Sequence, residues 1–369
     1  MKALVIGGTG PTGPHIINGL IERGYDVVML NRGSRDSDAI PAAVERVIGD
    51  PHFPDTLNDA LGTRTFDLVV ATYGRIRYVA EVVSTRTDRL ITVGGPPSYR
   101  GFADPYANFP PGMAVPTAED APRVESEAES RFGNLIRITE DAVMEQHASG
   151  AMNVTHFRYP VVYGPWQVRP TTLWWVMQRC LDGRSAAAVA DGGLTLFTRG
   201  YSENMAHAVL LAAEQPEASA GQIYNCGDDR QMSLAQWIST IAGAMGSDLE
   251  IVSVPDAYAS PSRDLMQFSS ADFHQFLDLT KLKTQLGYTD RVDSLEAIRR
   301  TVQWLTDNPP TEQQYIDDVR KHYAVEDALI KICRDAGEKM TALPHITEEF
   351  HHSYAHPRER GLERDHLNR

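Results

Sequence analysis

The residues with the clearest chemical meaning form a glycine-rich turn close to the start of the chain. The turn has the sequence Gly-Gly-Thr-Gly-Pro-Thr-Gly at positions 7–13 and follows an apolar run at 2–6. Glycines let the backbone turn sharply and approach a bound group, and free N–H groups at the start of a following helix attract negative charge. This chemistry suits the pyrophosphate of a dinucleotide. The residues predicted to contact it are Gly7, Thr9, Gly10, Pro11, Thr12 and Gly13.

The elements around the turn must hold it in place. Residues 15–24 carry apolar side chains at helical spacing and end on Gly24, and a second apolar strand follows at 26–30. Strand, glycine turn, helix and strand, in this order, open a dinucleotide-binding βαβ unit. A tight turn without a ligand is the alternative, but a glycine pattern between a strand and a helix favours a nucleotide site.

The end of the second strand predicts which dinucleotide is preferred. An acidic residue there would bind the 2′-hydroxyl of the adenosine ribose, whereas an arginine accommodates a 2′-phosphate. This chain has Asn31, followed by Arg32 and, three positions later, Arg35. We therefore expect NADP as the cofactor, with NAD less favoured. The alternative is that Arg32 is a solvated loop arginine.

Later strand ends supply the other predicted cofactor contacts. Strands are expected at 44–48, 66–71, 90–93 and 153–159. A carboxylate just after the first of these, Asp50, would accept a hydrogen bond from the adenine amino group. The remaining predicted cofactor contacts are Ala71, Thr72, Tyr159, Pro160 and Val162.

Composition narrows the classes of function. The chain has 369 residues, with 35 basic and 49 acidic side chains and a formal charge of −14. Such an acidic chain is a poor prospect for nucleic acid, whose binding depends on Lys and Arg clusters. The three cysteines lack metal-ligand spacing, and so do the six histidines of 311–369, so we expect no metal site. We also expect no signal peptide and no membrane span, hence a soluble cytoplasmic protein.

The chain as a whole predicts an α/β fold. We expect a Rossmann-type, doubly wound parallel sheet, a smaller C-terminal α/β substrate lobe and a helical C-terminal extension. The predicted boundaries are 1–165 for the Rossmann domain, completed by about 200–226. They are 166–200 and 227–310 for the substrate lobe, and 311–369 for the polar extension.

At these motifs the chain resembles the extended short-chain dehydrogenase/reductase superfamily, in its NAD-dependent epimerase/dehydratase group. The resemblance covers about 1–307. Besides the glycine turn and Gly49-Asp50, it rests on the segments 158–165, 203–208 and 221–227. Members of the family use a Ser or Thr after strand five and a Tyr-x-x-x-Lys on the next helix, where the Tyr relays a proton and the Lys lowers its pKa. Alignment puts Gly95, Phe132 and Ile136 at these positions.

This departure puts the family's usual acid–base chemistry in doubt, unless the alignment is shifted or the acid comes from elsewhere. Tyr73 and Tyr99, which follow strand ends, are the predicted catalytic proton donors, and Arg75 would bind a substrate anion. Two tryptophans lie where the resemblance places substrate contacts, and aromatic rings favour apolar or planar ligands. The predicted substrate contacts are Arg75, Gly95, Phe132, Ile136, Trp166 and Trp174.

These features predict an NADP(H)-dependent oxidoreductase of atypical mechanism that acts on a small, apolar or aromatic carbonyl or enone. Alternatives are an isomerase, lyase or cyclase that retains NADP, an epimerase or dehydratase of a nucleotide sugar and, less favoured, an NADP(H) sensor. Arg169 and Arg199 would suit an anionic substrate. The expected partners are a small-molecule substrate and a second copy in a homodimer, with neither nucleic acid nor membrane.

Overall fold

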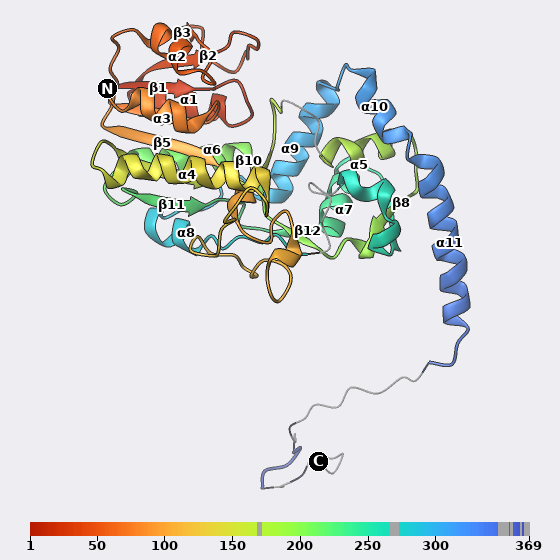
Figure 1. Cartoon of the computed structure of the whole chain (residues 1–369). Coiled ribbons are helices and arrows are strands. Elements are labelled where there is room, and N and C mark those ends of the chain that lie inside the picture. The colour runs from red at the N-terminus through yellow and green to blue at the C-terminus, as the bar shows by residue number, and fades with distance from the viewer. Residues whose placement is uncertain (168–171, 266–272, 346–353, 355–356, 362–363, 365–369) are drawn as a thin grey trace. The chain divides into compact units, whose positions relative to one another are not determined.

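A seven-stranded parallel sheet forms the centre of the protein (Figure 1). The computed structural model describes residues 1–167, 172–265, 273–345, 354, 357–361 and 364. The strand order is β11-β6-β5-β4-β1-β2-β3, and every neighbouring pair is parallel. The strands are β1 (Lys2–Ile6), β2 (Asp26–Asn31), β3 (Glu45–Ile48), β4 (Leu68–Ala71), β5 (Arg89–Gly94), β6 (Asn153–Arg158) and β11 (Gln222–Asn225). The predicted doubly wound fold is confirmed.

Helices cover both faces of this sheet, because the strands are apolar on both sides. One face packs in a cluster with α1 (Gly13–Glu22), α6 (Ser202–Glu214) and α8 (Thr280–Leu286). The other packs with α2 (Pro54–Leu61), α3 (Ile76–Val83) and α4 (Arg131–Ala148). All carboxyl ends of the strands therefore open to the same edge, where ligands of such sheets bind.

The start of α4 is later than the sequence suggests. Apolar spacing predicts a helix from residue 125, but α4 begins at Arg131 because the Ser130 hydroxyl caps it, accepting a hydrogen bond from the Gly133 N–H at 3.1 Å. Likewise, the helix predicted from residue 166 is α5 (Thr172–Leu181). Trp166 has a φ of +61°, which a helix does not accommodate.

A second apolar core contains α5, α7 (Leu234–Ala244) and α9 (Ser294–Asp307). With them pack the two-stranded sheets β8 (Ala186–Ala190) with β13 (Glu250–Val254), and β9 (Leu196–Phe197) with β12 (Met232–Ser233). A further pair, β7 (Val161–Tyr163) with β10 (Arg199–Tyr201), links this core to the large sheet. The predicted domain boundaries stay predictions.

The polar extension contains α10 (Gln313–Arg320) and α11 (Tyr323–Thr341). Contacts divide the chain into Met1–Ile330 and Lys331–Arg369, so α10 and the first turns of α11 belong with the main body. The buried carboxylate of Glu326 explains this division. It lies 3.1 Å from Arg179 Nη2 and 3.0 Å from Arg184 Nη2, and it accepts a hydrogen bond from the Ala188 N–H.

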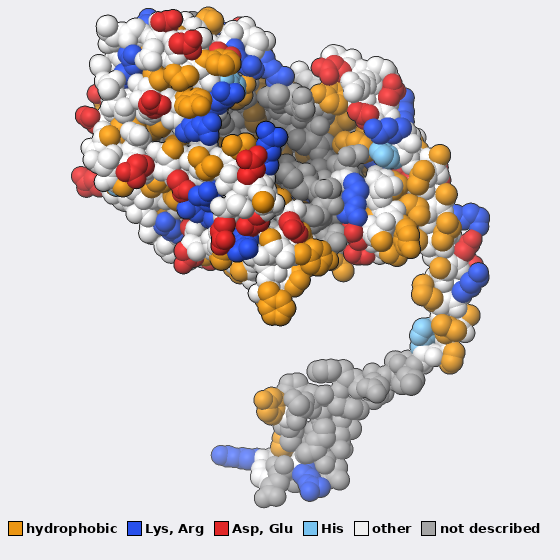
Figure 2. All heavy atoms as spheres, viewed as in Figure 1, with side chains coloured by type: hydrophobic (Ala, Val, Ile, Leu, Met, Phe, Trp, Pro, Cys, Tyr) orange, Lys and Arg blue, Asp and Glu red, His pale blue; other side chains and the backbone are white. Residues whose placement is uncertain are grey.

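Both signs of charge are interspersed with hydrophobic side chains over the face shown in Figure 2. Among the helices that the structure describes, none is long and apolar enough to cross a bilayer.

We predict that Glu326→Gln lowers the free energy of unfolding by about 3 kcal/mol, because it leaves the buried guanidinium of Arg179 without its carboxylate, whereas Arg184 keeps its pair with Asp327. Urea denaturation measures the loss. Asp335→Asn is the matched control, since the Lys331–Asp335 pair is exposed and its removal is expected to cost less than about 1 kcal/mol. Equal effects of the two changes would show that Glu326 does not hold the first turns of α11 against Arg179 and Arg184.

Candidate functional site

The glycine turn joins β1 to α1 by two close backbone approaches. Gly7 has a φ of +112°, and a Cβ placed there would lie 2.7 Å from Thr72 Oγ1. A Cβ on Gly13 would lie 2.1 Å from the Gly8 carbonyl oxygen. Side chains at these positions would force apart β4 and the two ends of the turn. At Gly10, in contrast, an added Cβ would meet nothing within 4 Å, so this face of the turn is open.

A cavity of 390 Å³ lies against the open face of the turn. It extends from the end of β2 to the segment after β6. Its predicted contact residues come from four separate parts of the chain. They are Gly7, Thr9, Gly10, Pro11, Thr12, Gly13, Asn31, Arg32, Arg35, Thr72, Tyr159 and Val162.

Three predicted cofactor contacts lie elsewhere. Asp50 lines a neighbouring open hollow, which shares Arg32 with the main cavity. Ala71 is completely buried in the core beneath the sheet. Pro160 lines a small, mostly enclosed apolar cavity. The structure therefore brings together most of the predicted set, and the binding roles of all fifteen residues remain predictions.

The end of β2 carries no free carboxylate. The Asn31 side chain is turned back on its own loop, where Oδ1 accepts a hydrogen bond from the Gly33 N–H at 2.9 Å. Arg32 lies over the Tyr73 ring, with Cζ 5.3 Å from the ring centre. No residue lining the main cavity is acidic. This end of the cavity therefore favours an anionic group over a sugar hydroxyl that needs an acceptor.

Tyr73 lines the main cavity, and its predicted role as a proton donor stays a prediction. Its ring contacts Arg32 at the end of β2 and His52 after β3, the latter at 5.1 Å between ring centres. In the strand order, β2 and β3 lie on the far side of β1 from β5. Tyr73 thus faces the adenosine half of a dinucleotide site.

Tyr99 is misassigned as a proton donor. Its side chain is completely buried, and its hydroxyl donates to Asn225 Oδ1 at 2.7 Å and accepts from Arg158 Nη1. Burial raises the pKa of Tyr99 to about 12. The hydroxyl is therefore committed to structural hydrogen bonds and does not line either the main or the small cavity.

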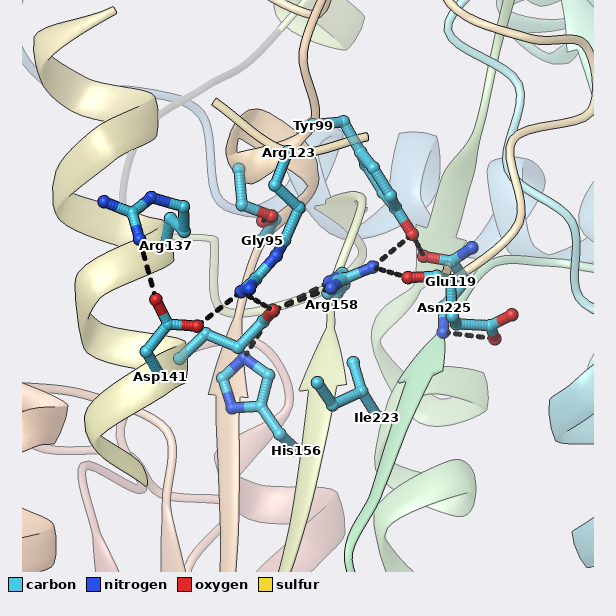
Figure 3. A network of polar contacts seen from close by, with 12 residues as sticks. Gly95, Tyr99, Glu119, Arg123, Arg137, Asp141, His156, Arg158, Ile223 and Asn225 are labelled. Atoms are coloured by element: carbon cyan, nitrogen blue, oxygen red, sulfur yellow. Dashed lines mark hydrogen bonds and ion pairs between the residues drawn. The ribbon is translucent and has the colours of Figure 1, made fainter. Parts of the chain in front are cut away.

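Arg158 and Glu140 form the centre of a buried polar network (Figure 3). Arg158 on β6 donates through Nε and Nη2 to the two carboxylate oxygens of Glu140 on α4, each at 2.7 Å. Arg123, from the long loop after β5, donates to Glu140 and to Asp141, again at 2.7 Å. Burial raises the pKa of Glu140, but hydrogen bonds and charge from Arg158 outweigh this and hold it below its ordinary value. The network fixes α4, β6 and the loop together.

The three positions that depart from the family pattern lie on elements that touch. Gly95 follows β5, while Phe132 and Ile136 lie one turn apart on α4. A Cβ on Gly133 would lie 2.4 Å from the Pro97 carbonyl oxygen, so α4 starts directly against the loop after β5. Phe132 is 58% exposed and Ile136 is half-buried, and none of the three lines either cavity. None carries a titratable group.

Arg137 does not replace the missing lysine, because its guanidinium is bound along its own helix. It donates to Asp141 Oδ2 at 2.8 Å (Figure 3). It also donates to Asn134 Oδ1 at 3.0 Å.

The remaining predicted substrate contacts are dispersed. Trp174, a predicted substrate contact, is 3% exposed and packs in the second core, so the structure does not bring it to either cavity. Trp166 lies edge-on to His15 at 5.4 Å, beside the first turn of α1. Arg75 is exposed and lies over the Phe53 ring at 5.5 Å, towards β3 and away from β5. Arg169 lies outside the described residues.

Two further features come from tertiary contacts. The small cavity brings together apolar residues from five segments, and Thr198 and Gln275 are its polar members. It is lined by Pro96, Phe102, Pro160, Val161, Phe197, Thr198, Gln275 and Leu277.

Arg199 is buried over the Trp237 ring at 4.4 Å, and within the described chain no carboxylate pairs with it. Burial lowers the pKa of Arg199 to about 10. Of these two features, the sequence predicted only Arg199, as a residue suited to an anionic substrate, and not the small cavity.

A family model described as "NAD dependent epimerase/dehydratase family" matches residues 3–90 and 107–227. The chain belongs to this family. A UDP-glucose 4-epimerase of Azospirillum brasilense is 25% identical over 332 residues, which cover 81% of this chain and 90% of that protein. A dTDP-glucose 4,6-dehydratase of Streptomyces niveus is 22% identical over 55% of each chain. The chain spans about half the length of this dehydratase and of an uncharacterised Sinorhizobium fredii protein, which it matches at 24% identity.

Solved structures agree in fold. A UDP-glucose 4-epimerase of Thermotoga maritima superposes with a TM-score of 0.68 at 19% identity, covering 84% of this chain and all of that one. A dTDP-glucose 4,6-dehydratase of Bacillus anthracis, solved in complex with NAD, has a TM-score of 0.66 at 15% identity, covering 85% of this chain and 99% of that one. At these identities the likeness establishes the architecture alone.

We predict that His156 makes stability depend on pH. Its Nδ1 lies 2.8 Å from Thr92 Oγ1, and burial lowers its pKa to about 4. In the unfolded chain it titrates near 6.5. The unfolded state therefore binds the extra proton first, and stability falls as pH drops below 6.5 towards 4. Between pH 7 and pH 5, wild type should lose about 2 kcal/mol more than His156→Gln in urea denaturation.

The control is His345→Gln, which changes an exposed histidine. If His156→Gln and wild type had the same pH dependence, the buried imidazole would not be neutral in the folded state.

Proposed function

We propose that this protein is an NADP(H)-dependent oxidoreductase of atypical mechanism that acts on a small apolar carbonyl or enone. The observation that supports it most directly is the main cavity, where the open glycine turn and two arginines lie together without an acidic residue. The residues fit a dinucleotide. Gly10 leaves room for a phosphate to approach the backbone, and Arg32 and Arg35 line the end where a ribose 2′-phosphate would lie.

NADP rather than NAD is the finer part of this proposal. Among the structural relatives, the dehydratase of Bacillus anthracis and an epimerase of Thermus thermophilus were solved with NAD. Here Asn31 uses its acceptor oxygen within its own loop, so it is not available to a ribose hydroxyl. Arg32 is held by stacking on Tyr73, which reduces the entropy lost when it binds a phosphate.

The bound nicotinamide supplies or accepts the hydride. The chain's own residues position the reactants. Tyr159 donates its hydroxyl to the Met205 carbonyl at 2.9 Å and so presents only its ring to the cavity. Pro160 and Val161, which follow Tyr159, line the small apolar cavity. The segment 159–162 therefore contributes to both the main and the small cavity. Since Gly95, Phe132 and Ile136 carry no proton, we infer that water protonates the product.

The test is consumption of NADPH with purified protein across a panel of apolar aldehydes, ketones and enones. Stoichiometric oxidation of NADPH with a subset of the panel is the expected result. Turnover of a substrate without a net change in NADPH absorbance would point instead to an isomerase, lyase or cyclase that retains the cofactor. If the protein binds NADPH but turns over no substrate of the panel, the result would favour an NADP(H)-sensing protein over an enzyme.

A second candidate is an enzyme of nucleotide-sugar metabolism. The buried guanidinium of Arg199, stacked on Trp237 and without a carboxylate partner in the described chain, suits an anionic group such as a diphosphate. Two of the relatives, the dTDP-glucose 4,6-dehydratase and the UDP-glucose 4-epimerase, are named for such sugars. Binding of UDP-glucose or dTDP-glucose that is lost in Arg199→Met would favour this candidate over an apolar carbonyl.

For cofactor selectivity, we predict that Arg32→Asp weakens NADPH binding by about 10- to 100-fold and changes NADH binding much less. The lost charge-assisted hydrogen bonds are worth about 1.5–3 kcal/mol. Fluorescence titration of both cofactors measures the difference. Arg64→Asp, which removes an arginine that pairs with Glu45 at 3.0 Å, is the charge-matched control. Equal weakening of both cofactors by Arg32→Asp would show a purely structural role.

A further inference from the structure

Three arginines near the main cavity lie over aromatic rings, and one of them, Arg32, also acts electrostatically on Asp50 in the neighbouring hollow. Arg32 Cζ lies 5.3 Å from the Tyr73 ring centre, Arg75 Cζ lies 5.5 Å from that of Phe53, and Arg77 Cζ lies 4.9 Å from that of Tyr78. Within the described chain, none of the three has a carboxylate oxygen within 4.0 Å. This is notable because the protein has 14 more acidic than basic side chains.

The ends of β3 and β4 bring this array together. A Cβ on Gly74 would lie 2.7 Å from Pro51 Cβ, so the two loops are in direct contact. The Arg75 backbone N–H donates to the Pro51 carbonyl at 3.1 Å. The next residue, His52, is edge-on to Tyr73. Because Tyr73 and Arg32 line the main cavity, the array is continuous with its adenosine end.

Two of the cations lie close to the same ring. The Cζ atoms of Arg75 and Arg77 are 6.0 Å and 4.9 Å from the centre of the Tyr78 ring. Both guanidinium groups therefore border the same ring, which attracts cations without neutralising their charge. Guanidinium groups bind phosphate oxygens with a matched, forked geometry and are less strongly hydrated than ammonium groups.

We propose that Arg75 and Arg77, together with Arg32, form an anion-capture surface that draws the phosphates of a dinucleotide to the mouth of the main cavity. This inference rests on the proposed function, because it takes the dinucleotide as the anion. A protein with a charge of −14 repels such a ligand at long range, and a local basic surface offsets the repulsion along the path of entry. Arg75 and Arg77 do not line the cavity itself, so they act on association more than on the seated complex.

The experiment measures association and dissociation rate constants for NADPH by stopped-flow fluorescence at low and high salt. For Arg75→Gln with Arg77→Gln, the association rate constant should fall about 5-fold at low salt, and its dependence on salt should shrink. The dissociation rate constant should stay within about 2-fold of wild type.

The control is Arg230→Gln with Arg299→Gln, which removes the same charge from exposed arginines of the C-terminal half, 56% and 62% exposed. It should leave association nearly unchanged. An equal fall in both double variants, an unchanged association rate, or an effect confined to dissociation would each overturn the proposed capture surface. If wild type binds no dinucleotide at all, the proposed function fails and this inference fails with it, whereas normal binding with unaltered association overturns the inference alone.

Discussion

The ion pair between Arg158 and Glu140 is the constraint on which the geometry of the site depends. Both side chains are almost completely buried, and two 2.7 Å hydrogen bonds join them in a forked pair. Desolvation offsets much of the attraction in such a pair, so its main contribution is to fix which groups lie opposite each other. Here the pair sets the position of α4 relative to the carboxyl end of β6.

The rest of the polar network extends this constraint to the loop after β5. Arg158 also donates to the Glu119 carbonyl at 2.8 Å. The Tyr99 hydroxyl, which accepts from Arg158, donates in turn to Asn225 on β11. A change in any of these groups would leave a buried charge or hydroxyl without its partner, which is costly. The network therefore holds the elements around the cavity together. The chain retains the scaffold of its family, and the prediction that Gly95, Phe132 and Ile136 occupy the family's acid–base positions remains a prediction from the sequence.

Charge is distributed unevenly between this frame and its surface. Many arginines of the described chain are paired with carboxylates, as Arg179 and Arg184 are with Glu326. Arg32, Arg75 and Arg77 lie instead on aromatic rings beside the cavity, and Arg199 lies on Trp237 in the interior. A cation stacked on a ring keeps its charge available to a ligand, whereas one in an ion pair does not. Arg179 and Arg184 also lie over aromatic rings, so what distinguishes Arg32, Arg75, Arg77 and Arg199 is that no carboxylate of the described chain pairs with them.

The sequence by itself determined the features that depend on neighbours along the chain. The glycine turn between β1 and α1, the alternation of strands and helices, the parallel sheet and the family all follow from local spacing, and the structure and the comparisons confirm them. The replacement of ionisable residues at Gly95, Phe132 and Ile136 is likewise visible in the sequence. Only the tertiary structure decided where individual side chains point. Tyr99 meets Asn225 across 126 positions and Trp174 packs against α7 and α9, so both leave the site that their sequence positions suggested. Tyr73 turns towards Arg32 because β4 lies beside β1 in the sheet, and the Arg158–Glu140 network forms because β6 and α4 pack together. A side chain's direction depends on contacts between residues far apart in sequence, and local spacing carries no record of them.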